Sequence, residues 1–229
     1  MSDPLTILHL THEGRGAGSS ISIALLAREQ AAAGHRVLVG CPDRTYLAGL
    51  VRGSGAELVP MAFAPGDASG AEVEQLAREA RVDVVNAHSS RDRAACRRLR
   101  LAGRLPGALV MTRRGMPMST PISAVLSGFA ADRTIAVSRP VARSLVRRGT
   151  PPWRVRVVHN AVDLARIDRA VTDQEAERVR ALIAADGRPV VGVVARRKDH
   201  DTLLRAMHFL TTPATLCIVG FQPDAALSR

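Results

Sequence analysis

Aromatic residues are scarce in this chain of 229 residues: they make up 3% of it, whereas apolar residues make up 46%. The core of the folded protein must therefore be aliphatic. Lysine is almost missing as well, because Lys198 is the single lysine and arginine supplies the rest of the basic charge. The formal net charge of +11 favours anionic partners such as nucleic acid, an acidic membrane face or phosphorylated ligands.

Cysteine is also rare, and long apolar runs are missing. Cys41, Cys96 and Cys217 are odd in number and far apart, with no CxxC motif or Cys/His cluster, so we interpret them as reduced thiols. No signal peptide opens the chain, and no run approaches the roughly 18 apolar residues of a membrane span. These absences predict a cytoplasmic protein, or one peripheral at the inner face of the cell membrane.

Short β-branched runs alternate along the chain with longer amphipathic runs. This alternation predicts an α/β fold with a parallel sheet that helices cover on both faces. The expected strands cover residues 5–10, 36–40, 57–59, 82–87, 108–112, 133–137, 155–159, 190–195 and 215–219. The expected helices cover residues 20–33, 46–52, 71–80, 91–101, 140–148, 172–185 and 201–210, and residues 61–70 and 113–123 are expected to be loops.

The pattern indicates two domains. Residues 1–165 are expected to form a Rossmann-like domain, and residues 166–229 a linker helix and an incomplete second Rossmann-like domain. A single βαβ unit cannot bury both faces of its sheet. The second part is therefore expected either to dock on the first or to begin something longer.

A glycine-rich loop lies between the first expected strand and helix and contains Gly16 and Gly18. Glycine lets a ligand approach the backbone, and a helix N-terminus presents free N–H groups to an anion. The loop is neither the G-x-G-x-x-G dinucleotide motif nor a P-loop, since no Gly-Lys-Ser/Thr follows. It is either a phosphate-binding loop or a purely structural turn.

Polar residues follow two of the expected buried strands. His88 ends the strand 82–87, and Arg113 and Arg114 follow the strand 108–112. Because ligands of parallel α/β sheets bind outside the carboxyl ends of the strands, His88 is a candidate for the cleft and the arginines for phosphate contacts. The alternatives are a histidine satisfied within a loop and a solvated basic loop.

The order and spacing of five segments resemble family 4 glycosyltransferases of GT-B architecture. Besides the glycine-rich loop, these are AAAGHRV, DVVNAHS, VVHNAVD, and VGVVAR with KDHDTLLRA, at residues 31–37, 83–89, 157–163, 191–196 and 198–206. The resemblance implies a GT-B fold in which the acceptor binds mainly to the N-terminal domain. It also implies that a nucleotide sugar binds mainly to the C-terminal domain and that transfer usually retains the anomeric configuration.

The resemblance also implies roles for particular residues. Gly16 and Gly18 would lie against the donor phosphate or the acceptor, His88 would contact the transferring sugar, and Arg196 and Lys198 would neutralise the leaving diphosphate. On the acceptor side the candidates are Arg113, Arg114, Ser138 and Asn160. The nucleotide sugar is a co-substrate, and we expect no cofactor and no metal.

The chain departs from the family pattern at three places. Ala161 follows Asn160 where glycine is common, and the stretch between Arg196 and Lys198 is short. The acidic E-x7-E segment that normally grips the donor would lie beyond Arg229. We therefore expect a truncated form with an incomplete donor site, weakly active or inactive alone.

Two other classes of function compete with a transferase acting on a cell-envelope glycan or lipid-linked acceptor. One is a non-catalytic module of GT-B ancestry that binds an acceptor or a partner. The other is a nucleic-acid binder, suggested by the basic helix 91–101. Because no aromatic residues interleave with its arginines for base stacking, nucleic acid is not expected as a partner. Docking of this helix to an anionic membrane is the more interesting alternative.

Overall fold

The computed structural model describes residues 3–15, 18–63, 68–116, 120–164, 171–183, 187–195 and 199–220. The chain divides into two compact units, residues 1–163 and 164–229, close to the boundary expected after residue 165. Among the described residues, no helix is long and apolar enough to cross a membrane.

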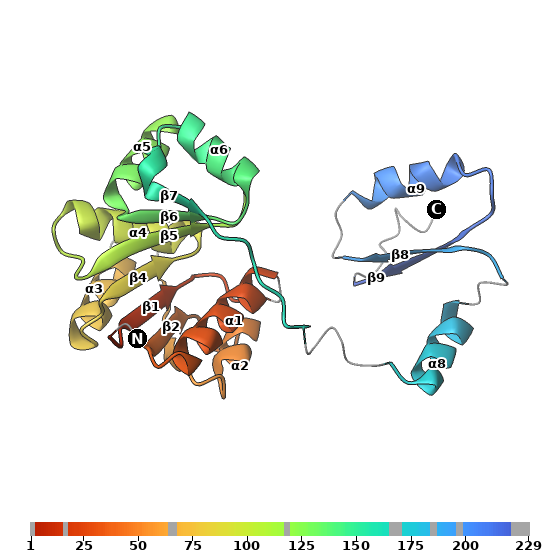
Figure 1. The fold of residues 1–229 in the computed structure, drawn as a ribbon, viewed down its shortest axis with the longest axis horizontal. Helices are drawn as coiled ribbons and strands as arrows, with labels where there is room; N and C mark the ends of the chain where they lie inside the picture. The colour runs from red at the N-terminus through yellow and green to blue at the C-terminus, as the bar shows by residue number, and fades with distance from the viewer. Residues whose placement is uncertain are drawn as a thin grey trace. The chain divides into compact units, whose positions relative to one another are not determined.

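The first unit is built on a seven-stranded sheet in which each paired neighbour runs parallel (Figure 1). The strand order is β3-β2-β1-β4-β5-β6-β7. The strands are β1 (Thr6–Leu10), β2 (Arg36–Cys41), β3 (Glu57–Pro60), β4 (Val84–Ala87), β5 (Ala108–Arg113), β6 (Arg133–Ala136) and β7 (Val155–Val157). The predicted Rossmann-like parallel sheet is confirmed.

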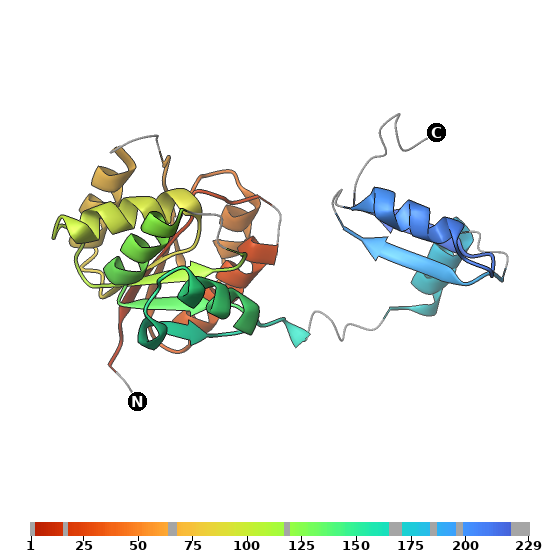
Figure 2. The same ribbon diagram turned by 90° about the horizontal axis from the view of Figure 1, so that it is seen from above.

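Helices cover both faces of this sheet, as the near-continuous apolar strands predict. They are α1 (Gly18–Ala32), α2 (Tyr46–Val51), α3 (Ala68–Glu79), α4 (Ser90–Leu101), α5 (Pro121–Ala130) and α6 (Arg139–Arg147). Alternate residues of β2 serve the two faces: Val37 and Val39 pack in the cluster of α1 and α2, and Leu38 packs in the cluster of α3 and α4. Figure 2 shows α4 and α5 side by side, and the two helices are in contact.

One helix of the first unit is not expected from the sequence. Residues 113–123 are expected to be a loop, but α5 begins at Pro121. The side chain of Thr120 accepts a hydrogen bond from the backbone N–H of Ser123, and proline occupies the first helical position. Both are ordinary helix-start signals, so the expectation of a loop through residue 123 is wrong.

The second unit contains one βαβ motif preceded by a helix. Its elements are α8 (Asp173–Ile183), β8 (Val190–Val194), α9 (His200–His208) and β9 (Thr215–Val219), and β8 pairs with β9 in parallel. Thr172 and Glu175 form a reciprocal capping box at the start of α8, with N–H···O distances of 3.0 and 3.2 Å. Among the described residues of this unit, His200 alone is buried.

The strand order places a topological switch point at β1. The chain proceeds outward from β1 through β2 and β3 on one side and returns to β4 on the other. The loops after β1 and β4 therefore leave the sheet in opposite directions and open a crevice at its carboxyl edge. His88 and residues 11–15, the described part of the glycine-rich loop before α1, lie at this edge.

Candidate functional site

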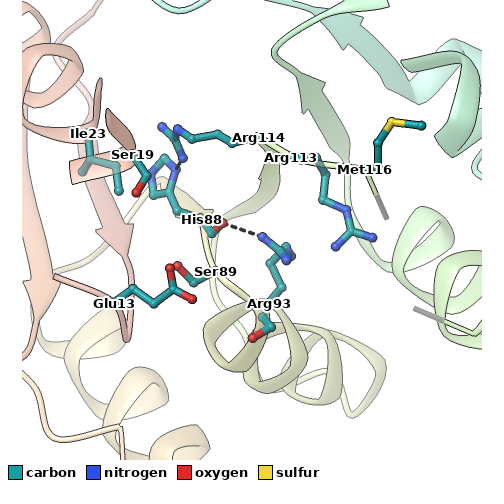
Figure 3. A pocket seen from close by; sticks show the side chains of 11 residues that line it. Glu13, Ser19, Ile23, His88, Ser89, Arg93, Arg113, Arg114 and Met116 are labelled. Atoms are coloured by element: carbon teal, nitrogen blue, oxygen red, sulfur yellow. Dashed lines mark hydrogen bonds between the residues drawn. The ribbon is translucent and has the colours of Figure 1, made fainter. Parts of the chain in front are cut away.

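A pocket of about 640 Å³ opens at the carboxyl ends of β1, β4 and β5 (Figure 3). Three segments form it: the loop after β1 with the start of α1, the junction of β4 and α4, and the loop after β5. Its lining residues are Glu13, Ser19, Ile23, His88, Ser89, Ser90, Arg93, Arg113, Arg114, Gly115 and Met116. A pocket of this size can hold a small ligand such as a substituted sugar.

A line of hydrogen bonds passes beneath this pocket from β1 to the loop after β5. His9 Nδ1 lies 3.0 Å from His88 Nε2, and His9 Nε2 lies 2.7 Å from the side-chain oxygen of Gln30 on α1. At the other end, an Arg114 guanidinium nitrogen lies 2.8 Å from His88 Nδ1. Both histidines are buried, and their rings stack with centroids 5.2 Å apart.

The chemistry of these groups fixes the direction of each hydrogen bond. Arginine can only donate, so His88 Nδ1 accepts from Arg114 and the proton of a neutral His88 sits on Nε2. That proton is donated to His9 Nδ1, and the His9 Nε2 proton is donated in turn to the Gln30 carbonyl oxygen. Every nitrogen of the two rings therefore has a partner.

Both imidazoles are held in the neutral form. Burial lowers the pKa of His9 to about 4, against the raising effect of the Gln30 hydrogen bond and with a smaller lowering from the Arg114 charge. Burial also lowers the pKa of His88 well below its usual value, helped by His9, Arg114 and Arg93. At pH 7 the pair adds dipoles to the site but no charge.

Three arginines surround the pocket above these histidines. Arg93 on α4 donates to the backbone oxygen of His88 (Figure 3). It also donates to the backbone oxygen of Thr112, which joins the ends of β4 and β5. Burial lowers the pKa of Arg93, and it lowers the pKa values of Arg113 and Arg114 to about 10. All three still carry a full positive charge at pH 7.

The first residues of the glycine-rich loop, Thr11 and His12, are tied to the start of α4. The Asp92 carboxylate is fully buried, accepts a hydrogen bond from the backbone N–H of Ser89 at 2.7 Å, and lies 3.0 Å from His12 Nδ1. The hydroxyls of Thr11 and Ser89 are 2.7 Å apart. These contacts hold the loop after β1 against the β4–α4 junction, so the pocket wall is preorganised.

A second pocket of about 310 Å³ lies beside the first and shares Arg114 with it. It is formed by α1, the ends of β4 to β6 and the segment after β7, and it is more apolar. Its lining residues are Ser22, Leu25, Leu26, Glu29, Gln30, Asn86, Thr112, Arg114, Ile135, Val137, Val158, His159, Asn160 and Ala161.

The structure brings three of the sequence-predicted site residues together. His88, Arg113 and Arg114 line the larger pocket, and Arg114 contacts the His88 ring. Asn160 lies in the second pocket instead. The arginine pair is thus part of a pocket wall, and both residues are partly buried, unlike the arginines of a fully solvated loop.

The remaining predicted residues lie elsewhere or outside the described residues. Ser138 caps α6, where its hydroxyl accepts from the backbone N–H of Val141, and it lines neither of these two pockets. Gly18 is exposed at the start of α1, and a Cβ built on it would meet open space. Gly16, Arg196 and Lys198 lie outside the described residues. Within the described ranges, no group of three or more His, Cys, Asp or Glu side chains could hold a metal ion.

Three residues of the site escape sequence reasoning: His9, Gln30 and Arg93. One signal for His9 exists, because it is the polar residue inside the otherwise apolar end of the strand 5–10. Gln30 and Arg93 sit on helices whose polar residues are indistinguishable from solvated ones in a sequence. Only the packing of α1 and α4 on the sheet shows their roles.

A doubly wound parallel sheet with a polar pocket at its switch point defines a Rossmann-like, ligand-binding α/β domain. The model of the family named Glycosyltransferase Family 4 matches residues 16–166, which is more than half of the chain. The chain therefore belongs to glycosyltransferase family 4. A search of curated proteins gives no significant match.

Solved structures confirm the GT-B type of fold. The Anabaena protein HepE in complex with UDP-glucose is 17% identical, with a TM-score of 0.77, over 95% of this chain and 61% of HepE. A glycosyltransferase from Rickettsia africae is 14% identical, with a TM-score of 0.71, over 96% of this chain and 61% of that protein. The chain thus spans about three fifths of the length of these two proteins.

The same fold also occurs in another class of enzyme. UDP-GlcNAc 2-epimerase from Neisseria meningitidis, bound to UDP-GlcNAc, is 10% identical, with a TM-score of 0.57, over 97% of this chain and 73% of the epimerase. At such identities the likeness concerns the fold alone. The family assignment therefore depends on the sequence match over residues 16–166.

Proposed function

We propose that this chain is part or all of a glycosyltransferase that moves a sugar from a nucleotide-sugar donor to a glycan or lipid-linked acceptor of the cell envelope, with retention of configuration. The observation that carries the proposal is the pocket at the switch point of a family 4 chain, which the neutral His88 and three arginines line together. The nucleotide sugar bound to HepE supports the donor class.

The reaction breaks the bond between the sugar C1 and the diphosphate oxygen, and the electron pair leaves with the nucleotide diphosphate. A new bond joins C1 to the acceptor oxygen, and the proton of that oxygen passes to the departing diphosphate. Negative charge develops on the leaving group, and fixed cations stabilise it. We assign this role to Arg196 and Lys198, with Gly16 and Gly18 against the donor phosphate or the acceptor, and we propose no metal.

We assign His88 to contact with the transferring sugar. Its two ring nitrogens already have partners in Arg114 and His9, so we assign it placement of the sugar and not removal of a proton. Arg113, Arg114, Ser138 and Asn160 are proposed for the acceptor side. Arg114 lines both pockets and Asn160 lines the second, so an acceptor that extends through both pockets would contact these two residues.

The test is transfer of labelled sugar from a panel of nucleotide sugars to an envelope extract. It is made with the 229-residue chain and with the product of the whole reading frame that contains it. We expect incorporation by that product and at least a tenfold loss in His88→Ala, with circular dichroism to show an intact fold. Binding of envelope glycan without transfer from any donor would favour a non-catalytic acceptor-binding module.

Donor affinity tests how the sites are divided between the two units. If most donor contacts come from the second domain, the 229-residue chain binds nucleotide sugar with a Kd at or above about 1 mM. Titration calorimetry with UDP-glucose measures this. Tight donor binding by the purified chain would contradict the proposed division.

We also propose that the protein is cytoplasmic and contacts an anionic membrane peripherally, but through another surface than the sequence suggests. Three arginines of the basic helix α4 bond to partners within the protein: Arg93 to His88, Arg97 to Ser123 and Ser127, and Arg100 to Asp132.

The next two helices, α5 and α6, present side chains that suit membrane contact better. Ile122, Leu126 and Phe129 on α5 are exposed apolar residues at helical spacing, and Arg139, Arg143 and Arg147 are exposed every fourth position of α6.

Co-sedimentation with vesicles tests this contact. We expect retention on vesicles of anionic lipid and not on neutral ones, since each basic residue near the surface contributes about 1 kcal/mol. The double variant Ile122→Ser with Arg143→Gln should lose the retention, and the exposed pair Arg44→Gln with Leu182→Ser should keep it. Equal retention on both kinds of vesicle would remove the proposal.

A further inference from the structure

The residues that line the larger pocket carry an excess of positive charge. Its lining contains the guanidinium groups of Arg93, Arg113 and Arg114 but a single carboxylate, that of Glu13, so the formal charge of the lining is +2. The Glu13 side chain is 62% exposed and is therefore well solvated. Figure 3 shows the three arginine side chains around one opening.

These arginines also have unused capacity to donate hydrogen bonds. Arg114 Nε is buried without any partner. In the described part of the chain, Arg113 has neither a side-chain hydrogen bond nor an ion pair, and none of the three arginines forms a salt bridge. The hydrogen bonds of the buried Asp92 carboxylate are made with His12 and the N–H of Ser89 and not with these arginines.

The arginines repel one another inside the protein. Burial is the main cause of the lowered pKa values. The charge of Arg93 adds to the lowering at Arg113 and that of Arg114 to the lowering at Arg93, while Asp92 offsets part of the lowering at Arg93 and Arg114, and Glu13 part of that at Arg93. None of the described carboxylates offsets the lowering at Arg113. A buried charge without a counter-ion is unfavourable, and a bound anion would supply one and reduce the repulsion among the arginines. The planar fork of arginine fits phosphate oxygens in pairs, and a lining of +2 matches a dianionic phosphate monoester better than a carboxylate.

We infer that this pocket binds a phosphate group of the acceptor, so that the sugar is transferred to a phosphorylated acceptor whose phosphate lies against Arg93, Arg113 and Arg114. The assignment of this phosphate to the acceptor depends on the proposed function. The binding of phosphate itself depends on the pocket alone. The volume of about 640 Å³ holds a phosphate together with the ring that carries it. His88, which we assign to contact with the transferring sugar, lines the same pocket. The hydroxyl that accepts the sugar would therefore lie close to the phosphate.

The test is titration calorimetry of the 229-residue chain at constant ionic strength with three probes: inorganic phosphate, glucose 6-phosphate and glucose. We expect binding of the first two and not of glucose. Arg113→Gln should weaken phosphate binding about tenfold or more, because it removes a charge-assisted donor. Arg113→Lys keeps the positive charge but loses the planar guanidinium, so its affinity for phosphate should lie between those of the unchanged protein and Arg113→Gln.

Arg91→Gln is the matched control, since Arg91 is exposed on α4 next to the pocket and does not line it. It removes the same charge and should change phosphate affinity less than twofold. An equal loss in Arg91→Gln and Arg113→Gln would show binding by general charge and overturn the inference. So would an absence of phosphate binding by a chain whose circular dichroism is intact.

A competition with UDP separates the two sources of phosphate. If UDP displaces glucose 6-phosphate and loses affinity in Arg113→Gln, the pocket belongs to the donor and the inference is wrong. Independent binding of the two supports it. In the transfer assay, equal transfer to phosphorylated acceptors by Arg113→Gln and the unchanged protein overturns the inference and leaves the proposed function standing. Phosphate binding that depends on Arg113, without transfer from any donor, supports the phosphate site and contradicts the proposed function.

Discussion

The histidine pair is the clearest case in which single residues determine the properties of the site. His9 would be a costly residue in a buried strand if either ring nitrogen lacked a partner. The bonds to His88 and Gln30 remove that cost, and the bond from Arg114 sets which nitrogen of His88 carries the proton. The tautomers are thus decided by an arginine on the rim of the pocket.

The pH dependence of stability follows from the low pKa of His9. Between pH 6.5 and pH 4 the unfolded chain takes up a proton that the buried ring refuses, so protons favour unfolding and stability falls as the pH falls. A shift from 6.5 to about 4 corresponds to a loss of about 3 kcal/mol in the free energy of unfolding over this window. His88 acts in the same direction. Urea denaturation at several pH values measures the slope.

Two variants separate this effect from the titration of other groups. His9→Gln removes the titrating ring and should flatten the slope between pH 6.5 and pH 5, even where its absolute stability is lower. His208→Gln changes an exposed histidine and should leave the slope unchanged. If His9→Gln kept the full slope, the buried ring would not be its cause.

At the scale of single elements, the turn before β5 depends on a glycine. Gly107 has a φ of 69°, and a Cβ on it would lie 2.5 Å from the backbone oxygen of Val82 and 2.6 Å from that of Asp83. Gly103, four residues earlier, has a φ of 68° but open space around its Cβ position. The two glycines share a left-handed conformation and differ in the room for a side chain.

Alanine at these two positions should therefore have different effects. Gly103→Ala is expected to lower the free energy of unfolding by about 1 kcal/mol, because alanine adopts the left-handed region poorly. Gly107→Ala should lower it by about 3 kcal/mol or more, because the backbone that positions β5 against β4 must also move. Chemical denaturation of both variants gives the difference. Similar losses would mean that the turn yields without strain.

Elements with a clear period are predictable from this sequence, and the reasons for the misses are physical. The strand 36–40 and the helix 46–52 are found to within a residue because apolar runs and glycines mark their ends. The helix α5 is missed because Gly115 and three prolines near residues 106–121 suggest a loop. In the site, the role of His88 is predictable because it directly follows a buried strand. The role of Gln30 is not, because it depends on how α1 packs on the sheet.

At the scale of the whole molecule, the two units differ in how well their strands are covered. In the first unit β1 and β2 are buried along most of their length, with Leu8, Leu10 and Val39 fully inaccessible. In the second unit β8 and β9 are intermediate or exposed throughout, and Val194 is 84% exposed. Local stability should follow this difference.

Amide hydrogen exchange should show the contrast directly. Strands buried on both faces open only with the whole domain, whereas strands with few buried apolar neighbours open locally. We expect the amides of β1, β2 and β4 to exchange about 10³-fold more slowly than those of β8 and β9. Mass spectrometry of peptides from both units measures this. Equal protection would mean that β8 and β9 acquire cover in solution.

The parallel sheet also divides the consequences of mutation between its two edges. The loops at the carboxyl edge carry the pocket, while the turns at the amino edge, such as those at Gly34 and Gly107, join helices to strands through glycines with positive φ. A systematic scan of substitutions should accordingly separate into two phenotypes. Changes at the first edge would alter what is bound in a protein that accumulates normally, and changes at the second would lower the amount of protein without altering its selectivity. Ligand preference can thus diversify over time while the scaffold remains the same.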